Sequence, residues 1–207
     1  MQAESLAMEI ARWYLAVFFC GVGLFYIVRI QSLASKLEQP VTYMGTRWSL
    51  HWVTHRLFRI FRMAIFLACL ARVPYPSVDA WLVPIAALWH PAVLLAGCLL
   101  LTLSFAGLVV INLYMNGYWR SGTRPDDVPA LITTGPFAIS QNPMTLLILL
   151  GQLGFFLALP SLFSLVCLAV GVWAVIAQTG VERGVLAEKF GDDYRDYALR
   201  TPRFLFR

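Results

Sequence analysis

Met144-Thr-Leu-Leu-Ile-Leu-Leu-Gly-Gln-Leu-Gly-Phe-Phe-Leu-Ala-Leu159 is a run of sixteen residues without a charge, and Leu162-Phe-Ser-Leu-Val-Cys-Leu-Ala-Val-Gly-Val-Trp-Ala-Val-Ile-Ala177 is a second. Only Pro160-Ser161 separates the two runs. Apolar helices joined by so short a turn must run antiparallel. Each run would be about 24 Å long as a helix, a little less than the roughly 30 Å hydrocarbon core of a bilayer. We therefore predict a membrane hairpin whose two helices each extend by a turn at their polar ends.

The whole chain has the composition of a polytopic membrane protein. Of its 207 residues, 59% are hydrophobic and 13% are charged, whereas soluble domains have roughly 25% charged residues. Three further apolar runs are candidate membrane helices: Trp13–Val28, Leu57–Ala71 and Val93–Met115. The segment Trp81–Trp89 is too short to span and is predicted to be interfacial or re-entrant. We expect an all-α fold with about five transmembrane helices in a single membrane domain, residues 1–207.

Lysine and arginine are distributed unevenly along this predicted topology. If the loop after the first span is cytoplasmic, fourteen of the 16 Lys and Arg residues lie inside, and only Arg12 and Arg72 lie outside. Membrane proteins keep such an excess in the cytoplasm, so the amino terminus is predicted outside and the carboxyl terminus in the cytoplasm. The formal net charge of +5 then reflects topology and attraction to membrane lipids rather than binding to nucleic acid.

Two polar clusters near the second span each have two interpretations. His51 and His55 are four residues apart, as in a helical metal site, but no acidic ligand lies nearby, and an interfacial helix is the favoured interpretation. Arg56, Arg59 and Arg62 recur every three residues, where they either anchor the helix at the interface or hold an anionic lipid or substrate group. The four cysteines fall in different apolar runs and are predicted to be buried, so no metal is expected.

The two ends of the hairpin are predicted to form one polar site. Because the chain doubles back, residues 135–143 before the first helix should lie beside Gln178–Arg183 after the second. Asn142 is in position to cap the first helix, with Pro143 in its first turn. A helix amino terminus attracts anions, because its first amides have no acceptor within the helix.

The carboxyl-terminal half also carries several motifs in a fixed order. These are Trp119-Arg-x-Gly122, Leu131-x-Thr-x-Gly-Pro-Phe137, Asn142-Pro-Met144, the apolar hairpin, and Glu182-x-x-x-Leu186-x-x-x-Phe-Gly-x-x-Tyr-x-x-Tyr197-x-x-x-x-Pro-Arg203. This order resembles the integral-membrane methyltransferases, a superfamily that includes isoprenylcysteine carboxyl methyltransferases and phospholipid methyltransferases. The resemblance covers the half formed by residues 119–207, whereas residues 1–118, the amino-terminal transmembrane helices, match only in being hydrophobic.

The resemblance implies a S-adenosylmethionine-dependent methyltransferase. Its cofactor site would be cytoplasmic and covered by the tail, the charged stretch that follows the hairpin from Gln178 onward. The acceptor would be lipophilic, an isoprenylcysteine carboxylate or a phospholipid amine, and would reach the site from the bilayer. The residues implied for the cofactor are Leu131, Ile132, Phe137, Asn142, Pro143, Met144 and Glu182, and those predicted for the substrate are Gln178 and Arg120. No residue is assigned to catalysis, because methyl transfer needs alignment and desolvation more than acid or base help.

The sequence departs from the family pattern at two places. The usual Arg-His-Pro or Arg-Asn-Pro-x-Tyr is Gln141-Asn-Pro-Met-Thr145 here, and the usual Glu-Glu pair is Glu182-Arg183. These departures leave one alternative, a fold relative without methyl transfer. Such a relative would be either an NADPH-dependent membrane reductase or a noncatalytic membrane protein.

Overall fold

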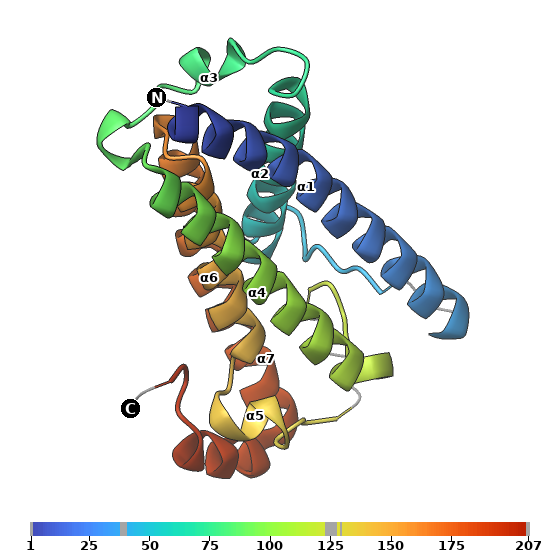
Figure 1. The fold of residues 1–207 in the computed structure, drawn as a ribbon. Helices are drawn as coiled ribbons and strands as arrows, with labels where there is room; N and C mark the ends of the chain where they lie inside the picture. The colour runs from blue at the N-terminus through green and yellow to red at the C-terminus, as the bar shows by residue number, and fades with distance from the viewer. Residues whose placement is uncertain (1, 38–40, 123–127, 129, 206–207) are drawn as a thin grey trace.

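A computed structural model of the protein describes residues 2–37, 41–122, 128 and 130–205, which form helices and no strand (Figure 1). This confirms the predicted all-α fold. The α-helices are α1 (Gln2–Leu37), α2 (Leu50–Ala71), α3 (Val78–Trp81), α4 (Pro91–Met115), α5 (Pro136–Ile139), α6 (Pro143–Ala158) and α7 (Leu162–Arg200). The 3-10 helices are η1 (Ala86–Leu88) and η2 (Asn116–Tyr118).

Each of the five predicted spans is helical, in α1, α2, α4, α6 and α7. Three helices of the described residues are long and apolar enough to cross a membrane: α1 from Ser5, α4 together with η2, and α7. Helix α6 is apolar but shorter, at 16 residues, and α2 carries three arginines, Arg56, Arg59 and Arg62. The membrane fold is thus confirmed, while the number of spans stays a prediction.

The predicted hairpin is confirmed as α6 and α7, which are joined by Leu159, Pro160 and Ser161. The predicted extension by one turn at each polar end is wrong, because α6 begins only one residue before Met144, at Pro143, and α7 continues to Arg200. Ser161 caps α7, because its hydroxyl accepts a hydrogen bond from the backbone of Ser164 at 3.2 Å. The segment before α4 packs on this turn: the indole of Trp89 donates to the Pro160 carbonyl at 2.6 Å, and the Leu162 amide donates to Val83 at 2.9 Å. Its helices α3 and η1 have only four and three residues, too short to span.

Helices α4 and α6 approach each other so closely that their backbones touch. A Cβ atom on Gly97 would lie 2.2 Å from the backbone nitrogen of Ala158, and one on Gly154 would lie 2.8 Å from that of Leu101. Farther along the same contact, the hydroxyl of Ser104 donates to the Leu147 carbonyl at 2.6 Å. Small residues and short polar side chains are the usual means of packing helices within membranes.

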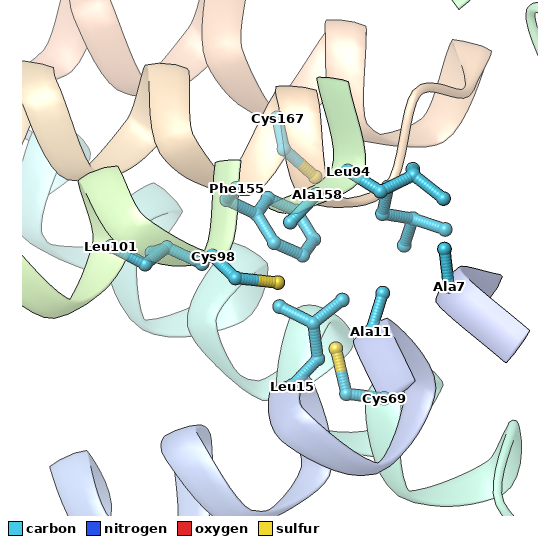
Figure 2. Packing of buried hydrophobic residues seen from close by; sticks show 11 residues of the cluster. Ala7, Ala11, Leu15, Cys69, Leu94, Cys98, Leu101, Phe155, Ala158 and Cys167 are labelled. Atoms are coloured by element: carbon cyan, nitrogen blue, oxygen red, sulfur yellow. The ribbon is translucent and has the colours of Figure 1, made fainter. Parts of the chain in front are cut away.

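The main apolar core lies where α1 and α2 meet the tip of the hairpin (Figure 2). It includes Cys69, Cys98 and Cys167, so the prediction that the cysteines are buried is confirmed for these three. The prediction is wrong for Cys20, which is exposed because it lies on a face of α1 that packs on no other described helix. The rest of the core is aliphatic or aromatic: Ala7, Ala11, Leu15, Leu94, Leu101, Phe155, Ala158 and Leu159.

Helix α7 bends sharply near its end. Gly191 has φ 50° and ψ −119°, a conformation that costs glycine little because it has no Cβ. The helix continues beyond the bend to Arg200, and this last part turns toward α5 at the end of the bundle (Figure 1). The bend returns the tail to the start of α6, where the candidate site lies.

We predict that Gly154→Ala destabilises the protein by roughly 1–3 kcal/mol, because the new methyl group meets backbone that cannot move aside. Thermal unfolding in detergent measures the effect. The matched control is Gly180→Ala on α7, where a Cβ meets no atom within 4 Å. Equal melting temperatures for the two variants would contradict the close packing of α4 on α6.

Candidate functional site

The site is built on a tight turn between α4 and α6. Gly135 adopts φ 58°, and a Cβ there would lie 2.7 Å from the ring of Tyr114. The same tyrosine hydroxyl lies 2.7 Å from the Thr134 hydroxyl, within hydrogen-bonding distance. Glycine is therefore needed at this position, and the turn directs the single helical turn of α5 and the start of α6 toward the tail.

The tail after Gly191 is hydrogen-bonded to this turn along its length. Tyr197 donates its hydroxyl to the Phe137 carbonyl at 2.7 Å. Gln141 donates its side-chain amide to the Thr201 carbonyl at 2.6 Å and its backbone amide to Pro202 at 2.9 Å. These bonds join residues about sixty positions apart in the sequence and fix the tail against residues 137–142.

Asn142 occupies the N-cap position of α6 and Pro143 the first turn, as predicted. The expected capping bond is absent, however, because the Asn142 side chain makes no bond to the amides of the helix. Its Nδ2 donates instead to the carbonyl of Arg203 at 2.9 Å. The Asn142 side chain therefore binds the tail and not its own helix. It links the start of α6 to Arg203.

A cavity of about 190 Å³ lies between the turn, the start of α6 and α7. Its walls come from four parts of the chain: the end of α4 with the loop after it, residues 128–132, the turn from α5 into α6, and the second half of α7. The lining residues are Met115, Tyr118, Trp119, Arg120, Gly122, Val128, Ala130, Leu131, Ile132, Phe137, Gln141, Asn142, Pro143, Met144, Thr145, Glu182, Arg183, Leu186, Tyr194 and Tyr197.

The structure brings together most of the residues singled out from the sequence. All seven residues implied for the cofactor line this one cavity: Leu131, Ile132, Phe137, Asn142, Pro143, Met144 and Glu182. Arg120, one of the two predicted substrate residues, lines it as well, and its guanidinium donates to the Gly117 carbonyl at 2.6 Å.

Gln178, the other predicted substrate residue, is not part of the cavity wall. Its Oε1 accepts a hydrogen bond from the Thr54 hydroxyl at 3.0 Å, and its Nε2 lies 2.8 Å from Nδ1 of His51. Gln178 thereby joins α7 to α2. The rings of His51 and His55 are in contact, tilted by 46° with centroids 4.6 Å apart, and their Nε2 atoms lie about 3 Å from where a Cβ of Gly122 would be. No group of three metal-ligating side chains occurs among the described residues.

Two tyrosines from the tail supply the polar and aromatic side of the cavity. Burial raises the pKa of Tyr197 to about 12. Burial also raises the pKa of Tyr194, against the opposing effect of Arg183. Both phenols are therefore neutral at physiological pH, and their hydroxyls donate to the turn, that of Tyr197 to the Phe137 carbonyl and that of Tyr194 to Oε1 of Gln141 at 3.3 Å.

Several lining residues lie outside the predicted set, although the sequence contained a signal for some of them. Trp119, Tyr194 and Tyr197 belong to the ordered motifs, and Gln141 and Thr145 are the departures from the family pattern. Thr145 lies 3.2 Å, hydroxyl to hydroxyl, from Thr179 on α7. Gln141 thus contacts the tail, and Thr145 contacts the second helix of the hairpin. No motif in the sequence pointed to the lining residues Met115, Val128 and Ala130.

Comparison with known families gives one match. A model of the phospholipid methyltransferase family matches residues 91–193. The matched stretch begins with α4, contains every residue implied for the cofactor, and ends just before the two cavity tyrosines of the tail. Searches of curated proteins and of solved structures found no match.

We predict that Gln141→Ala loosens the tail. The variant loses the 2.6 Å bond to Thr201 and the weaker contacts to Ala198 and Tyr194, at 3.4 and 3.3 Å. Leaving the Thr201 carbonyl without this donor is expected to cost roughly 1–3 kcal/mol. Hydrogen–deuterium exchange measured by mass spectrometry should show faster exchange in residues 194–203.

The matched control for this experiment is Gln31→Ala, an exposed glutamine on α1. Exchange in the tail should be the same in this control as in the unmodified protein. If Gln141→Ala leaves the exchange of residues 194–203 unchanged, the tail is held by other contacts.

We predict that the protein loses stability in mild acid through His55. Burial, together with neighbouring His51, Arg62 and Arg59, lowers the pKa of His55 to about 4, and its Nε2 is buried without a hydrogen-bond partner among the described residues. An unfolded histidine takes up a proton near pH 6.5. As the pH falls from about 6.5 to about 4, the unfolded chain therefore gains a proton that the folded chain excludes, and the free energy of unfolding decreases.

Melting temperatures measured in detergent between pH 7 and pH 4 test this effect. His55→Gln removes the titrating group, so the variant should show a shallower decrease over this range than the unmodified protein. Parallel curves for the two proteins would show that His55 is not the group responsible.

Proposed function

Because the model of the phospholipid methyltransferase family matches residues 91–193, we propose that this membrane protein transfers a methyl group from S-adenosylmethionine to a lipophilic acceptor. The observation that carries the proposal is the cavity. The seven residues implied for the cofactor come from three separate stretches of the chain, residues 131–137, residues 142–144 and Glu182, and all of them line one space.

The lining residues have a chemistry that suits S-adenosylmethionine. Its carboxylate suits the amino terminus of α6, where the first amides of the helix have no acceptor within the helix. Its ammonium group and hydroxyls suit the carboxylate of Glu182. Its positive sulfonium suits the aromatic faces of Phe137, Tyr194 and Tyr197, which attract cations by about 0.5–2 kcal/mol each.

When bound, S-adenosylmethionine supplies an electrophilic methyl group on its sulfonium sulfur. The chain's task is then to bring the acceptor atom into line with the methyl carbon and to exclude water, which are the main demands of a displacement. The tail serves this task, because Tyr194 and Tyr197 close one wall and the hydrogen bonds at Gln141 and Asn142 hold that wall in place. An amine acceptor must lose its proton before it reacts.

We further propose that the acceptor reaches the cavity from the bilayer and that the cavity lies on the cytoplasmic side. Helix α7 continues from the cavity into a surface that exposes Trp173 and Ile176, and the cavity itself lies at the ends of apolar helices. A water-soluble acceptor would gain nothing from this position. The cytoplasmic location rests on the distribution of lysine and arginine.

A methyl-transfer assay tests the proposal. Purified protein receives labelled S-adenosylmethionine with prenylated thiols carrying a carboxylate, aminophospholipids, or short water-soluble thiols and amines. We expect label in one of the two lipid classes only. Label confined to the soluble acceptors would contradict access from the bilayer, and no label in any acceptor would count against methyl transfer itself.

We predict that Glu182→Gln weakens the binding of S-adenosylmethionine about ten- to a hundredfold. The change removes a charged hydrogen-bond acceptor, and such bonds contribute roughly 1.5–3 kcal/mol. Calorimetric titration measures the affinity. The matched control is Glu188→Gln on the exposed face of the same helix, which should bind normally. Equal affinities for S-adenosylmethionine in the two variants would show that Glu182 does not bind the cofactor.

A further inference from the structure

Arg62 lies within the part of α2 that is predicted to span the membrane. It is ten residues before Arg72, or about 15 Å along the helix. Arg72 ends the helix in an ion pair with Asp79, which also binds Arg12 at 2.8 Å. Arg62 is therefore near the middle of a 22-residue helix. A permanent charge at such a depth is costly and usually marks a functional group with a specific partner.

The side chain of Arg62 has aromatic neighbours but no acidic one. Its guanidinium carbon lies 4.9 Å from the ring centroid of Phe58 and 5.8 Å from that of Tyr26 on α1. No carboxylate among the described residues forms an ion pair with it. Arg59, one turn earlier, donates to the sulfur of Met44 at 3.0 Å. Neither cation thus has a counter-charge among the described residues.

Arg62 is also close to the cavity wall. The Tyr26 ring, on which its guanidinium rests, lies 6.1 Å from the ring of Trp119. Trp119 lines the cavity and is buried. Tyr26 packs in one apolar cluster with Met115 and Met144, which line the cavity as well. One aromatic ring therefore separates the Arg62 cation from the wall of the candidate site.

We propose that Arg62, assisted by Arg59, binds the phosphate of a membrane phospholipid between α1 and α2. A guanidinium presents two parallel N–H donors that match a phosphate, and such charge-assisted pairs are strong where water is excluded. The acyl chains would lie along the exposed apolar side chains of the two helices, such as Ile27 and Met63. The ribbons of α1 and α2 diverge toward the loop that joins them (Figure 1). The site does not depend on methyl transfer.

Native mass spectrometry of the detergent-purified protein, without cofactor, tests the proposal. The probes are phosphatidylglycerol and a diacylglycerol with the same acyl chains but no phosphate. We expect the unmodified protein to retain phosphatidylglycerol at one saturable site and to bind diacylglycerol at least tenfold more weakly. Equal binding of both lipids would overturn the proposal without the use of any variant. Full displacement of the lipid by millimolar inorganic phosphate would show a site for soluble anions instead.

Variants then locate the site. Arg62→Gln should weaken phosphatidylglycerol binding about tenfold or more, and Arg62→Lys should weaken it less, because lysine keeps the charge but loses the paired donors. The matched control is Arg56→Gln, an exposed arginine of the same helix that lies 4.9 Å from the Trp52 ring. Equal losses at Arg56 and Arg62 would show diffuse attraction to the headgroup layer and would contradict a site at Arg62.

Discussion

The hydrogen bonds between the tail and residues 137–142 are the interaction on which the candidate site depends. They connect the end of the chain with the turn that starts α6. Without them the two tyrosines of the tail would have no fixed position, and one wall of the cavity would be missing. The bend at Gly191 makes the contact possible, because a straight α7 would carry these residues away from the turn.

The rest of the fold serves to bring the two ends of the hairpin to one place. Close packing of α4 on α6 at Gly97 and Gly154 sets the position of the α6 start relative to the end of α4, which supplies Met115 and, in the loop beyond, Trp119. The bonds of Gln178 to His51 and Thr54 hold α2 against α7. The amino-terminal helices therefore support the site from outside, although the matched family stretch begins only at α4.

The hairpin could be predicted from the sequence because its signal is local. Two uncharged runs and a Pro-Ser turn were sufficient, and α6 and α7 begin within one residue of their predicted starts. The contacts of individual side chains could not be predicted in the same way. Asn142 binds Arg203 rather than the amides of its own helix, and Gln178 binds a histidine 127 residues away. These hydrogen-bond partners depend on which distant segment of the chain lies next to the side chain in the fold. Neither the hydrophobic periodicity nor the residue spacing of the sequence contains that information.

The central claim, that the cavity is a S-adenosylmethionine site, is tested most directly by thermal unfolding of the detergent-solubilised protein with S-adenosylhomocysteine or NADPH. A ligand that binds only the folded state raises stability by mass action, by about 2.7 kcal/mol at a hundred times its dissociation constant. The account predicts a higher melting temperature with S-adenosylhomocysteine and no change with NADPH. Stabilisation by NADPH alone would contradict it and would favour a membrane reductase.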